Sequence, residues 1–186
     1  MNLVAVVTAL LALEYSPAAI ERAMSTLRSV PGRMELVSKP DAPVHVVVDY
    51  AHTPAALEQA LGSLREHTTQ RIWCVFGCGG ERDPGKRSEM GTIADRLADK
   101  IVLTNDNPRA EDPLRILRQI ESGIERHKAV RIPDRREAIE FAIRQADSGD
   151  LILVAGKGHE TTQVVGSERI PFSDQTVVAN LLEEIC

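Results

Sequence analysis

Charged and polar side chains gather in the loops that follow four apolar runs of the sequence. In chain order these loops carry Asp49, Tyr50 and His52; Arg82, Asp83, Lys86 and Arg87; Asp106, Asn107 and Arg109; and Lys157, His159 and Glu160. Ligands of an open α/β sheet bind outside the carboxyl ends of its strands, so these loops would lie together if the runs are parallel strands. Arginine and lysine groups there would bind carboxylate or phosphate oxygens. The pattern predicts one polar binding face built from four loops.

The segment 77–88, GCGGERDPGKRS, comes within one residue of a phosphate-binding P-loop, because the Gly-x4-Gly-Lys spacing begins at Gly80. Arg87 stands where a P-loop carries the Ser or Thr that holds Mg²⁺. The interior ERDP adds two acids, which would repel phosphate oxygens, and a proline, which supplies no N–H. We therefore interpret the segment as a turn that presents Arg82, Lys86 and Arg87 to carboxylate or phosphate oxygens.

The segment DNPR, residues 106–109, predicts a turn that holds an arginine close to a strand end. Pro108 prevents the next helix from starting early and leaves Arg109 beside the sheet edge. A simple strand-to-helix turn with a solvated arginine remains an alternative.

The segment GKGHE, residues 156–160, combines two glycines that allow close backbone approach with a lysine, a histidine and a glutamate. A catalytic His–Glu dyad is conceivable, but no GxSxG turn supplies a nucleophile, so a structural or ligand-contacting role is favoured. His52 and His159 would make only a two-ligand metal site. We predict no metal site and no catalytic residue in this chain.

Composition excludes several classes of function. The net charge of −5 and the aromatic content of 3% disfavour a nucleic-acid binder. Cys74, Cys78 and Cys186 form neither a disulfide framework nor a zinc motif, which favours reduced thiols in a cytoplasmic protein. The apolar run at residues 1–17 lacks a basic start and is too short to cross a bilayer, so we expect a buried helix and no membrane partner.

Short apolar runs alternate with amphipathic segments from residue 44 onward. The expected strands are residues 44–50, 71–76, 100–105, 129–133 and 150–155, and the expected helices are residues 54–67, 87–99, 113–127 and 136–147. This alternation predicts an α/β protein with a Rossmann-like, doubly wound, mostly parallel sheet.

Two further features complete the expected fold. Residues 162–172 predict a C-terminal β-hairpin that turns at Gly166 and Ser167, followed by a helix with Ser173 as its N-cap. The first 31 residues break the alternation and predict two helices, the second capped by Ser16.

Taken together and in order, these loops resemble the C-terminal part of the Mur ligases. The matching segments are PGRMELV, VVVDYAHTPAALEQAL, CVFGCGGERDPGKRSEMG, TNDNPRAEDP and LVAGKGHETTQ. DYAHTP and GKGHE are typical of one branch of the family, and DNPR is typical of the members that add meso-2,6-diaminopimelate. The resemblance implies an ATP-dependent, amide-forming ligase of peptidoglycan biosynthesis. ATP would phosphorylate the D-glutamyl carboxylate of UDP-MurNAc-L-Ala-D-Glu, and the diaminopimelate amine would attack the acyl phosphate.

The resemblance also implies roles for individual residues, assigned by motif position. The residues implied to hold meso-diaminopimelate are Arg82, Asp106, Asn107, Pro108, Arg109, Gly156 and Glu160. On the nucleotide side, Arg33 and Asp49 would lie near the ATP ribose and His52 near the phosphates. An arginine at the far carboxylate of diaminopimelate would be left unpaired by lysine, which lacks that group.

In the family, the P-loop, the Mg²⁺ ligands and a carbamylated lysine belong to a central domain whose motifs this sequence lacks. We therefore expect ATP and Mg²⁺ to be bound mainly by that domain, and the chain to be inactive alone. Residues 1–31 are interpreted as a helical remnant of the central domain, and residues 32–186 as the C-terminal domain. Two alternatives stay open: another amide ligase of the superfamily, of the folylpolyglutamate or cyanophycin synthetase type, against which DNPR argues, and a non-catalytic module that binds ATP or an amino acid.

Overall fold

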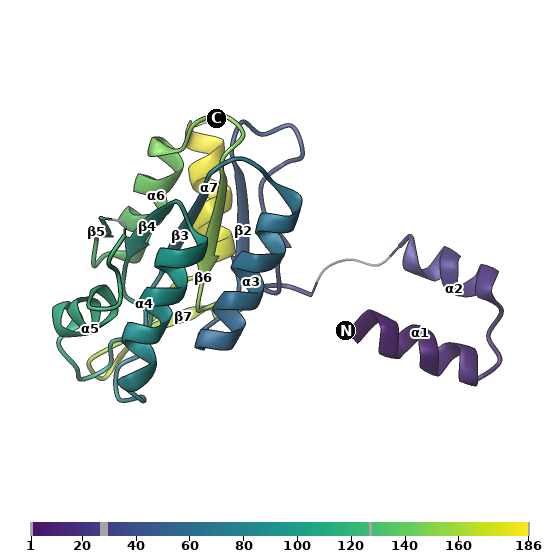
Figure 1. Ribbon diagram of the computed structural model, residues 1–186, viewed down its shortest axis with the longest axis horizontal. Coiled ribbons are helices and arrows are strands. Elements are labelled where there is room, and N and C mark those ends of the chain that lie inside the picture. The colour runs from purple at the N-terminus through teal and green to yellow at the C-terminus, as the bar shows by residue number, and fades with distance from the viewer. Residues whose placement is uncertain (1, 27–29, 127, 186) are drawn as a thin grey trace.

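The computed structural model describes residues 2–26, 30–126 and 128–185 of the chain. An α/β unit follows two N-terminal helices, α1 (Asn2–Ala12) and α2 (Pro17–Met24), which lie away from it in Figure 1. The side chain of Ser16 accepts a hydrogen bond from the backbone N–H of Ala19, which confirms the predicted cap of α2. No helix within the described ranges is long and apolar enough to cross a membrane.

The expected burial of the first helix is wrong in this structure, although the helix itself is present. Its apolar side chains Leu3, Val4, Val6 and Leu11 are exposed, and only Ile20 of the neighbouring α2 is buried. The helix is apolar on most of its circumference, so α2 alone covers too little of its surface to bury it.

The central sheet has six strands. Their order is β1 (Glu35–Leu36), β2 (His45–Asp49), β6 (Leu151–Ala155), β3 (Ile72–Phe76), β4 (Lys100–Leu103) and β5 (Val130–Arg131). Every pair is parallel except β1 with β2, which is antiparallel. This arrangement confirms the predicted mostly parallel sheet. The edge strand β1 was not predicted, because two residues are too few to show a strand pattern.

Helices cover both faces of the sheet (Figure 1). One face carries α3 (Pro54–His67), α4 (Gly85–Leu97) and α5 (Pro113–Glu121), and the other carries α6 (Arg135–Gln145) and α7 (Asp174–Ile185). Strand β3 shows why its sequence is continuously apolar. Cys74 and Phe76 point into the first layer, while Trp73 and Val75 point into the second, because side chains alternate along a strand.

The C-terminal predictions are confirmed. A hairpin of β7 (Thr162–Val165) and β8 (Glu168–Pro171) turns at Gly166 and Ser167, where Gly166 has a φ of +59°. The hydroxyl of Ser173 accepts a hydrogen bond from the N–H of Thr176 at 3.3 Å and so caps α7. Helix α5 ends earlier than predicted, at Glu121 rather than at residue 127, because Gly123 favours termination.

Two cysteines are buried in the core, which gives a first testable prediction. Burial raises the pKa of Cys74 and raises that of Cys78 to about 12, so neither thiol ionises at neutral pH. Iodoacetamide at pH 8 should leave both residues unmodified in the native chain and alkylate them in urea, as peptide mass spectrometry would report. Rapid labelling of either residue in the native chain would contradict the burial.

Candidate functional site

The loops at the carboxyl ends of β2, β3, β4 and β6 surround a cavity of about 440 Å³. Of the predicted site residues, those that line this cavity are His52, Arg82, Asp106, Asn107, Arg109, Gly156 and Glu160. Four loops that are far apart in sequence, from Tyr50 to Glu160, thus contribute to one face. The predicted convergence of these loops is what the structure displays.

Two arginines lie around the backbone of Gly79 at one wall of the cavity. A methyl group added at Gly79 would lie 3.0 Å from Nη1 of Arg109 and 3.6 Å from Cγ of Arg82. Arg109 donates from Nη1 to the carbonyl of Gly80 at 2.8 Å, which fixes its direction. Arg82 is exposed and has no hydrogen bond or ion pair within the described ranges. Its donors are therefore available to a ligand that carries carboxylate oxygens.

Glu160 supplies a negative charge to the cavity, opposite in sign to the two arginines. Its Oε2 accepts hydrogen bonds from Nζ of Lys157 at 2.7 Å and from Nδ2 of Asn107 at 3.0 Å. Burial alone would raise the pKa of Glu160, but these two hydrogen bonds and the charge of Lys157 lower it overall. The carboxylate therefore stays ionised at neutral pH and can accept a hydrogen bond from an ammonium group.

Lys157 was expected on the polar binding face but was assigned no ligand, and the structure shows that it organises this part of the site. Its side chain is fully buried, and Nζ also donates to Oδ1 of Asn107 at 3.1 Å. The same oxygen of Asn107 accepts from the N–H of Val164 on β7 at 2.9 Å, so the hairpin joins the network. The signal available in the sequence was a lysine flanked by two glycines directly after a buried strand.

Asp106 and Gly156 form a close contact at the base of the cavity. Asp106 is 7% exposed, and a methyl group on Gly156 would lie 2.7 Å from its Oδ2. Gly156 also has a φ of +119°, which a side chain would strain. Only glycine fits here, so the backbone of the GKGHE segment comes directly against the DNPR segment. Pro108 is buried behind them and does not line the cavity.

The predicted nucleotide side forms an aromatic cluster around Tyr50. The guanidinium carbon of Arg33 lies 4.6 Å from the ring centroid of Tyr50. The rings of His52 and His159 lie 4.5 Å and 5.1 Å from the same ring. Asp49 is buried, and its Oδ2 accepts from the N–H of Met34 at 2.8 Å. Asp49 thus holds the turn that carries Arg33, and neither of these two residues lines the cavity.

The interpretation of the glycine-rich segment needs one correction. Lys86 lines the cavity and donates to the carbonyl of His52 at 2.8 Å. Arg87, by contrast, is 1% exposed and is already bound by Glu111, so it presents nothing to a ligand. Its place in the first turn of α4 directs the side chain inward against α5 rather than toward the cavity.

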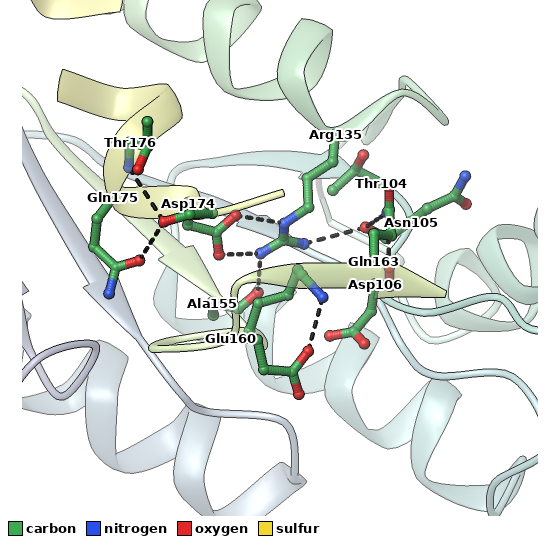
Figure 2. A network of polar contacts seen from close by, with 12 residues as sticks. Thr104, Asn105, Asp106, Arg135, Ala155, Glu160, Gln163, Asp174, Gln175 and Thr176 are labelled. Carbon is green, nitrogen blue, oxygen red and sulfur yellow. Dashed lines mark hydrogen bonds and ion pairs between the residues drawn. The ribbon is translucent and has the colours of Figure 1, made fainter. Parts of the chain in front are cut away.

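A second buried arginine supports the loops from behind, as Figure 2 shows. The guanidinium of Arg135 binds both carboxylate oxygens of Asp174 at 2.8 Å. It also donates to the carbonyl of Asn105 at 3.2 Å and to the carbonyl of Ala155 at 3.0 Å. These carbonyls directly precede Asp106 and Gly156, so Arg135 holds the ends of β4 and β6 at their observed separation.

The charge pattern suits a small zwitterion. Free arginine donors and an ionised glutamate face one cavity, which fits a ligand with both carboxylate and ammonium groups. Within the described ranges, no group of three or more His, Cys, Asp or Glu side chains could hold a metal ion.

Comparisons with known proteins identify the family of the chain. Residues 32–158 match the family described as Mur ligase, glutamate ligase domain. The UDP-N-acetylmuramoyl-L-alanyl-D-glutamate--2,6-diaminopimelate ligase of Coxiella burnetii is 50% identical over 176 residues, which are 93% of this chain and 35% of that protein. The chain therefore spans about a third of the length of this relative.

Solved structures extend the comparison. A structure of a UDP-N-acetylmuramoyl-L-alanyl-D-glutamate--2,6-diaminopimelate ligase is 41% identical with a TM-score of 0.78, covering 98% of this chain and 38% of that one. The folylpolyglutamate synthase/dihydrofolate synthase of Yersinia pestis, solved with AMPPNP and a Mn ion, shares the fold at 22% identity and a TM-score of 0.61, covering 96% of this chain and 38% of that one. The family of the chain follows from the family model, which matches well over half of the residues. The chain belongs to the Mur ligase family and contains its glutamate ligase domain.

Proposed function

We propose that this chain is the amino-acid-binding part of an ATP-dependent ligase that adds meso-diaminopimelate to UDP-MurNAc-L-Ala-D-Glu in the cytoplasm. The observation that carries the proposal is the placement of Arg82, Arg109 and ionised Glu160 around one cavity. The diaminopimelate ligases that the chain resembles are named for this substrate.

The charges around the cavity would favour diaminopimelate over lysine. Diaminopimelate carries an amine and a carboxylate at each end, whereas lysine has only an amine at its far end. Arg109, with Asn107 beside it, would bind the far carboxylate, and Glu160 would bind the far ammonium group. Lysine would leave the arginine without a carboxylate partner, and a hydrogen bond to a charged group contributes about 1.5–3 kcal/mol.

The remaining steps are proposed to need residues outside this chain. ATP would supply the phosphoryl group that activates the D-glutamyl carboxylate, bound with Mg²⁺ mainly by a preceding domain. Arg33, Asp49 and His52 would contribute to the nucleotide side, with Asp49 acting through the turn that it holds. Residues 1–31 would be the end of that preceding domain, residues 32–186 the C-terminal domain, and the chain alone would not catalyse the reaction.

Calorimetric titration of this chain with meso-diaminopimelate and with L-lysine tests the proposal. We expect meso-diaminopimelate to bind at least about 10-fold more tightly, which corresponds to about 1.4 kcal/mol. Arg109→Ala should remove this preference, while Arg144→Ala, an exposed change on α6, should leave it intact. Equal affinity of the wild-type chain for both ligands would contradict the assigned specificity.

A further inference from the structure

Arg87 is the buried centre of a polar cluster between α4 and α5, and its partners in the cluster are partly exposed. Its Nη1 and Nη2 each donate to one carboxylate oxygen of Glu111 at 2.9 Å, which makes a bidentate ion pair. Nη1 also donates to Oε1 of Gln119 at 2.5 Å, and Nη2 donates to the carbonyl of Gly79 at 3.1 Å. The side chain therefore joins α4, α5 and the glycine-rich loop, and no ligand can reach it.

Glu111 extends this cluster to the residue that precedes Arg82. Its Oε1 accepts a hydrogen bond from the backbone N–H of Glu81. Glu81 has a φ of +53°, a conformation that non-glycine residues adopt only when their surroundings hold them there. The bond to Glu111 supplies such a constraint, and the direction of Arg82 depends on the backbone at Glu81.

A second set of contacts joins the same two loops. The N–H of Gly80 donates to the carbonyl of Asn107 at 2.9 Å, and Arg109 returns a bond to the carbonyl of Gly80. A methyl group on Gly80 would lie only 1.9 Å from the carbonyl oxygen of Pro108. Residues 79–82 and 107–111 are thus packed as one body, with Arg82 and Arg109 projecting from it.

We propose that Arg87 and Glu111 are a positioning pair that sets the spacing of Arg82 and Arg109 and thereby the selectivity of the site for a ligand with carboxylates at both ends. This inference rests on the proposed function. Hydrogen bonds from Arg87 and from the N–H of Glu81, with the charge of Arg87, lower the pKa of Glu111 to about 2. The pair therefore stays charged throughout the neutral range and keeps its geometry.

Two variants test the pair in this chain. Glu111→Gln keeps the shape of the side chain and removes its charge. Arg87→Lys keeps the charge and removes the bidentate contact. Glu58→Gln is the matched control, because Glu58 is exposed and pairs with Arg96 on the helical surface. Calorimetry with meso-diaminopimelate and L-lysine measures selectivity, and amide hydrogen exchange at Gly80 and Glu81 measures the loop without any ligand.

We expect both variants to lower the affinity for meso-diaminopimelate about 10-fold or more and to change the affinity for L-lysine less than about 2-fold. Exchange at Glu81 should become at least about 10-fold faster, while the control variant matches the wild type in both measurements. Either variant retaining wild-type selectivity and wild-type exchange would overturn the inference. If the wild-type chain bound neither ligand, the proposed function would fail, and exchange alone would then decide whether the pair positions the loop.

Discussion

Replacing Arg135 by methionine is expected to lower the free energy of unfolding by about 3–5 kcal/mol. Both Arg135 and its partner Asp174 are fully buried, so the substitution leaves a carboxylate inside the protein without its counter-charge. Urea denaturation followed by the fluorescence of Trp73, the single tryptophan of the chain, measures this change.

Two controls separate the buried charge from the loss of packing. Replacing both partners, as Arg135→Met with Asp174→Leu, should restore most of the lost stability, since an apolar pair needs no charge compensation. Arg136→Met, one residue later, removes only an exposed ion pair with Glu184 and should change stability by less than about 1 kcal/mol. Wild-type stability of the single Arg135→Met variant would contradict the role assigned to the pair.

Replacing Lys157 by methionine is expected to lower the free energy of unfolding by about 2–3 kcal/mol at neutral pH, the second-largest effect that we predict. The change removes a fully buried ammonium group, and among the described residues it leaves Asn107 as the one side-chain donor to Glu160. It should also weaken binding of meso-diaminopimelate, because the carboxylate of Glu160 loses the contact that orients it.

The effect of Lys157→Met should depend on pH in a defined direction. In the wild type the folded pKa of Glu160 is lowered, so its contribution to stability is present above the unfolded pKa of about 4.3 and is lost as the pH falls. The stability difference between wild type and variant should therefore shrink between pH 6 and pH 3. Lys128→Met, at an exposed lysine, provides the matched control. A difference that is constant over this range would show that Glu160 is not the group affected.

Most of the fold could be predicted because its signals are local. Apolar runs such as the one at β3 are buried on both sides, and the caps at Ser16 and Ser173 follow from single side chains. The convergence of four loops also followed from the sequence, since parallel strands place their carboxyl ends at one edge of a sheet.

The parts that could not be predicted depend on partners distant in sequence. Arg87 was predicted to face a ligand, and its contacts with Glu111 and Gln119, 24 and 32 residues later, show that it is internal. Lys157 likewise acquires its role from Asn107, 50 residues earlier. The apolar first helix satisfied every local criterion for burial, but burial depends on what packs against a helix, and local pattern carries no such information.

The position of β6 in the strand order has a consequence for how the chain acquires its structure during synthesis. β2 pairs with β1 and β6, and β3 pairs with β4 and β6, so β6 alone joins the two halves of the sheet. Residues 151–155 leave the ribosome after every other strand of this sheet. Until then the nascent chain holds two incomplete half-sheets, each with an unpaired inner edge exposed to association with other chains. The binding face, which needs Gly156 and Glu160, is therefore completed only after β6 and the segment that follows it have been made.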